Sequence, residues 1–152
     1  MKVDIKQIFK KEDERVLIEC VAITPEINDI RSYVLAKGSE FPGVSQDGHH
    51  VRIRLADIYY FEALDEKVFA YTLDAVFEIR LRLYEVENAY HSCHFIRCSK
   101  SVVLNLMLLD SISPSLNGRF TAHMKNGEKL IISRQYAPVL KDYISGKESY
   151  HA

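Results

Sequence analysis

The sequence predicts a mainly β protein of antiparallel strands with short helices, preceded by a small strand-plus-helix segment. Its 152 residues, 47% of them apolar, are enough for one domain with its own core. From residue 49 onward, apolar and polar side chains alternate, as in strands that bury one face. Two Asn-Gly dipeptides stand between apolar runs, and this dipeptide is the strongest short hairpin signal.

The first 38 residues predict a small α/β segment. Residues 15–20, with the sequence RVLIEC, are a strand-like run. A helix is predicted from Thr24-Pro25-Glu26 to Gly38. Its start has a hydroxyl N-cap, a Pro at the first helical position and an acid in the first turn. Residues 39–48 concentrate turn-forming residues and predict a linker.

The predicted helix has an apolar stripe of Ile27, Ile30 and Val34. These side chains must be buried somewhere, because 38 residues make too small a core alone. Residues 1–38 are therefore expected to contribute to dimerisation or partner docking. The alternative is that they pack as a cap on their own β domain.

Residues 49–146 predict the β domain, and residues 147–152 predict a tail. The expected strands are 49–55, 58–63, 68–72, 75–80, 94–98, 119–125 and 128–133, with short helices over 83–90 and 136–144 and a polar turn at 64–67. We expect type I′ turns at Asn117-Gly118 and Asn126-Gly127, since that turn needs positive φ at both central residues. Ser133 is the expected N-cap of the last helix.

Composition also indicates the cellular compartment of the protein. Charged residues make up 27%, and no apolar run approaches the ~20 residues of a membrane span. The N-terminus lacks the apolar core of a signal peptide. We therefore expect a cytoplasmic protein whose three cysteines, Cys20, Cys93 and Cys98, are reduced thiols.

Motifs for catalysis or cofactor binding are absent from the sequence. It contains no Gly-rich phosphate loop, no GxSxG and no HExxH. His91, Cys93, His94 and Cys98 are zinc-type donors, but their spacing matches no standard finger, so a polar loop is the preferred interpretation. Glu62 could be a buried general base, although a hydrogen-bonded acid is preferred. We expect no enzyme activity, cofactor or metal.

Charge is unevenly distributed along the chain. Residues 97–152 hold eight Lys and Arg against four Asp and Glu, a net charge of +4 in a protein of net charge −1. This asymmetry indicates either a basic face that meets a polyanion or ordinary scatter. Several cations fall in or beside predicted loops, among them Lys67, Lys100 and Arg134, where such side chains can reach phosphates and base edges.

One family pattern runs through residues 49–146. The segments that carry it are DIYYFEA at 57–63, VFAYT at 68–72, FEIR at 77–80, LYEVE at 83–87, FIRCSKSVVLNL at 95–106, PSLNGR at 114–119, NGEKL at 126–130 and ISRQY at 132–136. In their order and spacing, residues 49–146 resemble the LytTR DNA-binding domain of bacterial transcription regulators. The resemblance implies elongated antiparallel β-sheets, which agrees with the strands predicted above.

The resemblance also implies site residues. Members of the family insert loops and a helix start into successive major grooves of double-stranded DNA. By position, the base-contacting loops fall at Lys67, Lys100 and Arg134. Further DNA-binding residues are expected at Arg97 and Lys129, which look like phosphate contacts, and at Asn105, which looks like a structural or backbone-binding residue. Many members have His where this chain has Ser99, so the local contact there differs.

Partners follow from the same resemblance. The family typically binds repeated sites as pairs, which implies a homodimer on DNA. About 48 residues precede the domain, too few for the receiver domain that most members carry. The chain resembles the short, receiver-free type, often paired with a small multi-pass membrane protein encoded nearby. The rival hypothesis is a protein-interaction module that docks on a membrane partner and binds DNA weakly.

Overall fold

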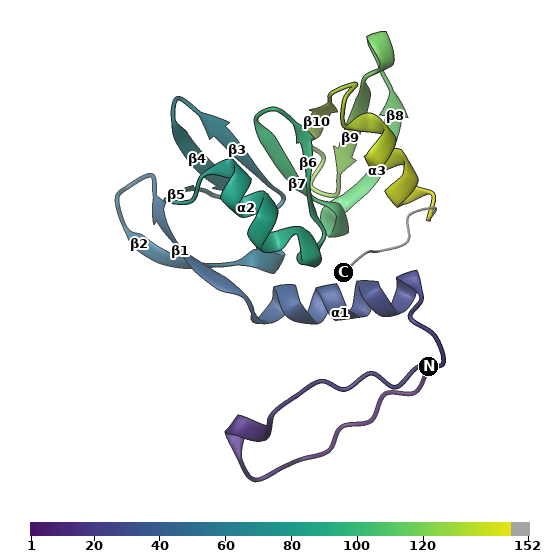
Figure 1. The fold of residues 1–152 in the computed structure, drawn as a ribbon. Helices are drawn as coiled ribbons and strands as arrows, with labels where there is room; N and C mark the ends of the chain where they lie inside the picture. The colour runs from purple at the N-terminus through teal and green to yellow at the C-terminus, as the bar shows by residue number, and fades with distance from the viewer. Residues whose placement is uncertain (147–152) are drawn as a thin grey trace.

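Two antiparallel sheets lie side by side in the computed structural model of the protein, with helix α1 below them (Figure 1). The structure describes residues 1–146, so the predicted tail at 147–152 lies outside the described residues. In chain order the elements are α1 Pro25–Gly38, β1 Glu40–Ser45, β2 His50–Arg54, β3 Tyr60–Leu64, β4 Lys67–Tyr71, β5 Val76–Ile79, α2 Leu83–Tyr90, β6 Phe95–Ser99, β7 Val102–Asn105, β8 Leu109–Pro114, β9 Phe120–Met124, β10 Lys129–Ile132 and α3 Ala137–Ile144. The predicted mainly β antiparallel class is confirmed.

The larger sheet has seven strands in the order β2-β1-β5-β4-β3-β7-β6. All its neighbouring strands are antiparallel. One hydrophobic cluster lies between this sheet, α1 and α2, and includes the fully buried Phe61 and Phe95 with ring centroids 5.5 Å apart. Helix α2 begins at a buried Leu83 and buries Val86 one turn later, as its predicted apolar side requires.

The smaller sheet has three strands in the order β10-β9-β8. A second hydrophobic cluster joins this sheet to α3 and to the β6–β7 side of the larger sheet, through residues such as Cys98, Leu104, Ile132 and Leu140. The two sheets therefore share a packed junction at β6 and β10.

Residues 39–48 are not a linker, and the prediction there is wrong. Residues 40–45 form β1, which pairs with both β2 and β5 inside the larger sheet. Phe41 is buried in the core. Gly43 is used for close packing, because a side chain there would meet Ile53 and, at 3.3 Å, the Cβ of Phe77. The glycine that suggested a loop is instead the residue that lets two strands pack closely.

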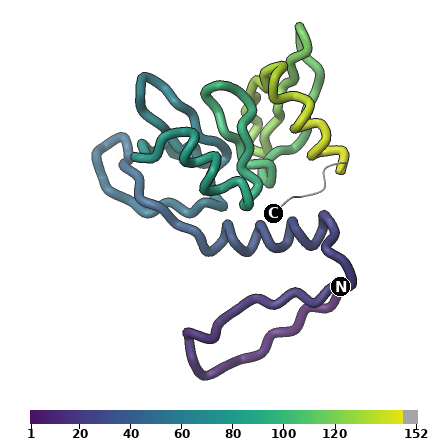
Figure 2. Tube along the Cα trace, in the orientation of Figure 1, coloured from purple at the N-terminus to yellow at the C-terminus, as the bar shows by residue number. Residues whose placement is uncertain are grey.

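The N-terminal segment matches the prediction in its helix but not in its strand. Helix α1 spans Pro25–Gly38, and the Thr24 hydroxyl accepts a hydrogen bond from the N–H of Ile27 as the predicted N-cap. The run at 15–20 forms no strand, and residues 1–24 extend away from both sheets (Figure 2). A strand needs a neighbouring strand for its backbone groups, and the run at 15–20 makes no backbone hydrogen bond to another segment of the described chain.

Helix α1 packs on its own β domain, as the second alternative for residues 1–38 stated. Ser32 is buried and its hydroxyl donates to the carbonyl oxygen of Ser92 across 3.0 Å. Ala36 is also buried, whereas the predicted stripe of Ile27, Ile30 and Val34 is only half-buried. The side of α1 that faces the domain therefore consists of small residues, and part of the apolar stripe stays at the surface.

The two Asn-Gly turns differ from each other. Asn117 and Gly118 have φ of 60° and 72°, so both positions are left-handed as predicted. At Asn126-Gly127 only the glycine has positive φ, at 87°, so the type I′ assignment is wrong there. Gly127 N–H donates to the Met124 carbonyl and Met124 N–H to the Glu128 carbonyl, which makes a three-residue turn with glycine in its left-handed position.

The start of α3 also differs from the prediction. Its N-cap residue is Tyr136, not Ser133. The Ser133 hydroxyl is buried without a hydrogen-bond partner, while the Ser133 carbonyl accepts from the N–H groups of Tyr136 and Ala137. The backbone of Ser133 thus supports the first turn in place of its side chain. Among residues 1–146, no helix is both long and apolar enough to span a lipid bilayer.

Candidate nucleic-acid interface

Two hairpin turns with basic residues lie side by side at one end of the larger sheet. Strand β3 pairs with β4 on one side and with β7 on the other, so the β3–β4 and β6–β7 turns point the same way. The N–H of Ala63 donates to the Ser101 carbonyl across 2.8 Å and links the two turns directly. Lys67 follows the first turn and Lys100 lies in the second.

The start of α3 joins the same end of the molecule. Strand β6 has a register shift between Arg97 and Ser99 that leaves Cys98 as an extra residue. The Cys98 carbonyl accepts the N–H of Ser133 across 2.9 Å, which places Arg134 beside the β6–β7 turn. In Figure 1 the β3–β4, β6–β7 and β8–β9 tips all lie along the top of the view, where α3 also begins. We call the surface formed by Lys67, Lys100 and Arg134 the basic edge.

All three side chains of the basic edge are exposed. Lys67 makes an ion pair with Glu78 across 3.7 Å, and both side chains remain open to solvent. Such an exposed pair contributes little to stability, and Lys67 can easily exchange Glu78 for another anion. The structure thus brings the three residues that the resemblance assigns to base-contacting loops to one surface, from three separate connections.

Arg97 is held within the protein. Its Nε donates to Glu87 Oε2 across 2.9 Å, and its terminal NH1 donates to the carbonyl of Lys100 across 2.6 Å. The guanidinium therefore ties α2 to the β6–β7 turn. This geometry gives Arg97 contacts that shape the turn carrying Lys100.

Asn105 and Lys129 lie away from the basic edge. Asn105 is buried at 3% exposure, its Nδ2 donates to the Ile58 carbonyl, and its Oδ1 accepts from the N–H of Met107. These bonds match the structural option for Asn105. Lys129 is exposed at the start of β10, next to the β9–β10 turn, whereas Arg134 follows the opposite end of that strand.

The β8–β9 loop adds residues beside Arg134 that the sequence alone did not assign to the site. A hollow of about 310 Å³ is lined by Gly118, Phe120, Arg134, Ala137, Pro138, Lys141 and Asp142. Lys141 Nζ lies 5.1 Å from the Phe120 ring centroid, and a Cβ on Gly118 would lie 3.2 Å from the Arg134 stem. The Asn-Gly turn was visible in the sequence as a turn, but its position beside Arg134 depends on the packing of α3.

The candidate zinc donors are not gathered into a site. No group of three or more His, Cys, Asp or Glu in residues 1–146 is placed to hold a metal ion. Cys93 and Cys98 are buried thiols. Burial raises the pKa of the Cys98 thiol to about 12, so this side chain packs as an apolar group.

Glu62 is a hydrogen-bonded acid, as the preferred interpretation of this residue stated. Tyr71 donates its hydroxyl proton to Glu62 Oε1 across 2.9 Å, and the Tyr71 ring stacks on Tyr60 with centroids 4.3 Å apart. Burial, and then the hydrogen bond to Glu62, raise the pKa of Tyr71 to about 12. The contacts of Glu62 are those of a structural pair between strands.

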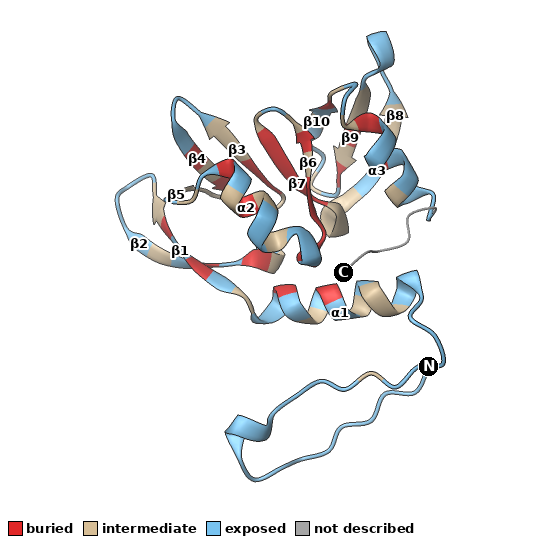
Figure 3. Cartoon of the chain, viewed as in Figure 1, coloured by how far each residue is buried: buried red, intermediate tan, exposed pale blue. Residues whose placement is uncertain are grey.

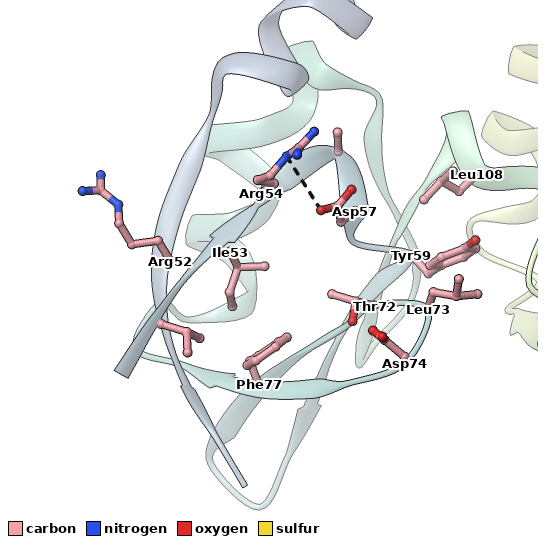
Figure 4. Close-up of a pocket in the computed structure, with 12 residues that line it drawn as sticks. Arg52, Ile53, Arg54, Asp57, Tyr59, Thr72, Leu73, Asp74, Phe77 and Leu108 are labelled. Atoms are coloured by element: carbon pink, nitrogen blue, oxygen red, sulfur yellow. Dashed lines mark ion pairs between the residues drawn. The ribbon is translucent and has the colours of Figure 1, made fainter. Parts of the chain in front are cut away.

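A larger hollow lies at the other end of the sheet. It has a volume of about 480 Å³ and lies between β2, the turn at 55–57 and the β4–β5 connection (Figure 4). Arg54 and Asp57 form an ion pair of 3.8 Å at its rim, and Ile53 and Phe77 form part of its apolar wall. Because it opens beside Leu73 and Asp74, it is separate from the turns of the basic edge.

The fold and the basic edge together define a β-sheet DNA-binding domain. The family model of the LytTr DNA-binding domain matches residues 48–145. The chain therefore belongs to the LytTr DNA-binding domain family, and the predicted resemblance is confirmed.

Individual proteins agree with this assignment. Two proteins from Staphylococcus aureus, of strains RF122/ET3-1 and NCTC 8325, are each 29% identical to this chain over 127 residues, covering 80% of it and 85% of the relative. Both are named uncharacterized HTH-type transcriptional regulators. A solved LytTr DNA-binding domain from Bacillus cereus superposes with a TM-score of 0.64 at 25% identity, covering 70% of this chain and 96% of the other.

The helix-turn-helix of those names has no counterpart in the described residues 1–146. Helices α2 and α3 are separated by the five strands β6 to β10, and in the described residues no second α-helix follows either of them after a short turn. A helix-turn-helix places two consecutive helices against DNA. In this chain, hairpin turns and one helix start occupy the exposed basic surface instead.

Proposed function

We propose that this protein is a transcription regulator that binds duplex DNA with its basic edge and reads sequence there. The observation that carries the proposal is the convergence of Lys67, Lys100 and Arg134, from three connections, on one exposed surface. A row of cations on loops suits the phosphate backbone, and long side chains on loop tips can enter a major groove. The named relatives and the family support the same role.

Each residue of the basic edge has a distinct task in this proposal. Arg134 precedes α3, an eight-residue helix whose positive dipole end favours an anion nearby, and its planar fork can bond two acceptors of guanine. Lys100 presents a point charge from a tight turn, which suits a phosphate. Lys67 contacts the backbone or a base edge on the far side of the β6–β7 turn.

The remaining predicted DNA residues support these three in different ways. Arg97 positions the β6–β7 turn through its bond to the Lys100 carbonyl, and Asn105 holds β7 against the Ile58 carbonyl. Both thus act through the shape of the basic edge. Lys129 meets a phosphate only if the DNA extends along the exposed face of β10, so its contribution is expected to be smaller than that of Lys100.

The proposal also covers assembly and location. Binding to repeated sites as a pair would place one basic edge on each repeat, and this requires a homodimer. The chain works in the cytoplasm, where its DNA is, and acts by binding and not by catalysis. A small multi-pass membrane protein encoded nearby stays a prediction for the source of the signal.

Selection from a random duplex pool, followed by footprinting, tests sequence-specific binding. Affinity for the selected site is then measured over a salt series, because neutralised phosphates release counterions and make binding steeply salt-dependent. Lys67→Ala, Lys100→Ala and Arg134→Ala combined should abolish specific binding. Lys125→Ala is the matched control, since Lys125 is an exposed cation at the β9–β10 turn, away from the basic edge.

Two outcomes would overturn the proposal. Selection that enriches no sequence, with no salt dependence of binding, would leave the chain as a protein-interaction module. An equal loss of binding free energy per removed charge in the triple variant and in Lys125→Ala would show that net charge, and not the basic edge, determines binding.

A further inference from the structure

Residues 1–24, which we call the arm, form an exposed and apolar extension of the domain. Figure 3 shows the arm exposed along nearly its whole length. Its exposed large apolar side chains are Met1, Val3, Ile5, Ile8, Phe9, Val16, Leu17, Val21 and Ile23. Single exposed apolar residues are normal, but nine of them gathered in one segment mark a surface that another molecule covers.

The arm also has the pattern and the free backbone of strands. Apolar and charged residues alternate in KVDIK at 2–6, and Val16, Ile18 and Cys20 share one side of the run at 15–20. Within the arm, the only backbone hydrogen bonds are those of the short turn at Lys11–Asp13. Both runs therefore offer unpaired N–H and C=O groups, which are a template for pairing with another chain.

Charge on the arm favours a second copy over DNA. The arm has five basic and five acidic residues, interleaved along its length, so its net charge is zero. A segment of this kind does not attract a polyanion, whereas two copies of it can align opposite charges. In a two-fold dimer each patch meets the same patch of the partner, and this requires the self-complementarity that the arm has.

The exposed apolar area of the arm is large enough for a stable dimer. A Val, Leu or Ile side chain contributes roughly 60–120 Å² of apolar surface, from its transfer free energy at about 25 cal/mol per Å². Nine such side chains supply roughly 500–1,000 Å² per copy, close to the ~800 Å² per partner of a standard interface. Tyr33 and Leu35 on α1 are exposed apolar side chains as well.

We propose that the arm is the dimerisation element of the protein. The arms of two copies pair as β-strands and bury Val3, Ile5, Val16 and Ile18 between them. Both β domains are then held together on the α1 side, away from the basic edges at the opposite side of the domain in Figure 1. The role of this dimer in paired DNA binding rests on the proposed function, whereas dimerisation itself does not.

Sedimentation equilibrium of the full chain without DNA tests the proposal. The wild-type chain should be a dimer, and Val3→Asp with Ile5→Asp should raise the dissociation constant at least ~100-fold, because four apolar side chains are lost per dimer. These residues are 84% and 95% exposed, so the substitutions leave the fold of one chain intact. Leu73→Asp is the control, since Leu73 is 71% exposed on the β4–β5 connection, and it should leave the dimer unchanged.

A second measurement locates the contact. Cys93 and Cys98 are buried, and Cys20 shares a side of the arm with Val16 and Ile18, so the label site is Glu19→Cys on the opposite side, in a Cys20→Ser background. A thiol-specific spin label then attaches to the arm alone. Dipolar spectroscopy should then show a defined distance between labels on two copies. The amplitude of this dipolar signal should fall when labelled chain is diluted with unlabelled chain. A monomeric wild-type chain would overturn the proposal and favour a different partner for the arm, and so would a dimer that persists unchanged in the arm variant.

The DNA experiment separates this proposal from the previous one. The arm variant should bind a single repeat with wild-type affinity and lose only the cooperative gain on a double repeat. Arg134→Ala should weaken single-repeat binding and remain a dimer. If the wild-type chain dimerises through the arm but binds no DNA, the proposed function fails and the dimerisation proposal stands.

Discussion

The backbone N–H of Ser133 donates to the carbonyl of Cys98 across 2.9 Å, directly beside the residues that we assign to DNA. This bond joins β6 of the larger sheet to the segment that follows β10 of the smaller one. It is formed at the extra residue of β6, and bulges of this kind often orient residues next to a functional site. The spacing between Lys100 and Arg134 is therefore fixed, so that the two side chains can contact DNA at a set distance from each other.

Arg134→Ala should cost roughly 1–3 kcal/mol in binding free energy on the selected site and relax preference at one base pair. The reason is the loss of a bidentate contact that discriminates between bases. Affinities for the selected and a scrambled duplex, measured at several salt concentrations, check this. If the variant discriminates between the two duplexes as well as wild type, base readout does not belong to Arg134.

Lys100→Ala should weaken binding to both duplexes by similar factors. A point charge on a phosphate contributes to every sequence equally, so the slope of log K against log salt should fall by about one unit. Lys100→Arg should restore most of the affinity, since the positive charge is kept. A selective loss on the selected duplex would instead assign base readout to the β6–β7 turn.

Much of the fold could be predicted from local patterns. Strands that alternate, such as β2, and strands closed by polar turns, such as β3 and β4, were predicted within a few residues. Strand β7 was not predicted, because Val102–Asn105 is buried along its whole length and has no alternation. The Pro and Gly of strand β1 are typical turn formers and predict a linker, whereas in the structure Gly43 permits close packing of two strands.

The candidate site could be predicted only in part. The resemblance pointed to Lys67, Lys100 and Arg134, and the structure brings all three to one edge. The resemblance could not show that Arg97 is hydrogen-bonded to Glu87 and to the Lys100 carbonyl, or that Asn105 is buried. Those contacts join residues of different elements, so they follow from packing and not from any spacing along the chain.

Gly118 should be more sensitive to substitution than Gly127 in DNA binding but not in folding. Both glycines have positive φ, so Gly118→Ala and Gly127→Ala should each destabilise the fold by about 1 kcal/mol. Only at Gly118 would the added Cβ press on another side chain, the Arg134 stem at 3.2 Å, whereas nothing lies within 4 Å of it at Gly127. Gly118→Ala should therefore also lower affinity for the selected site.

Melting temperatures and DNA affinities of the two glycine variants check this prediction together. Similar melting temperatures, with a loss of affinity confined to Gly118→Ala, are the expected result. Equal affinities would show that the Arg134 stem adjusts to the new methyl group, and that the β8–β9 loop does not position Arg134.

The buried His94 should make the free energy of unfolding depend on pH. The side chain is buried, with an αL backbone of φ 66°, and its Nδ1 lies 3.6 Å from Asp29 Oδ1 of α1. Burial lowers the pKa of His94, and the Asp29 carboxylate opposes that shift only in part. The unfolded chain thus takes up a proton near pH 6.5 that the folded chain still resists.

The free energy of unfolding should therefore be constant above about pH 6.5 and decrease below it, by at most ~1.4 kcal/mol per pH unit from this one group. Urea unfolding at pH 7.5 and 5.5, at one protein concentration, measures the difference. His94→Asn is the matched variant, because Asn tolerates the αL backbone and does not titrate in this range. It should lose stability at pH 7.5 through lost packing but show a smaller decrease on acidification. An equal decrease in both proteins would place the acid sensitivity in another group.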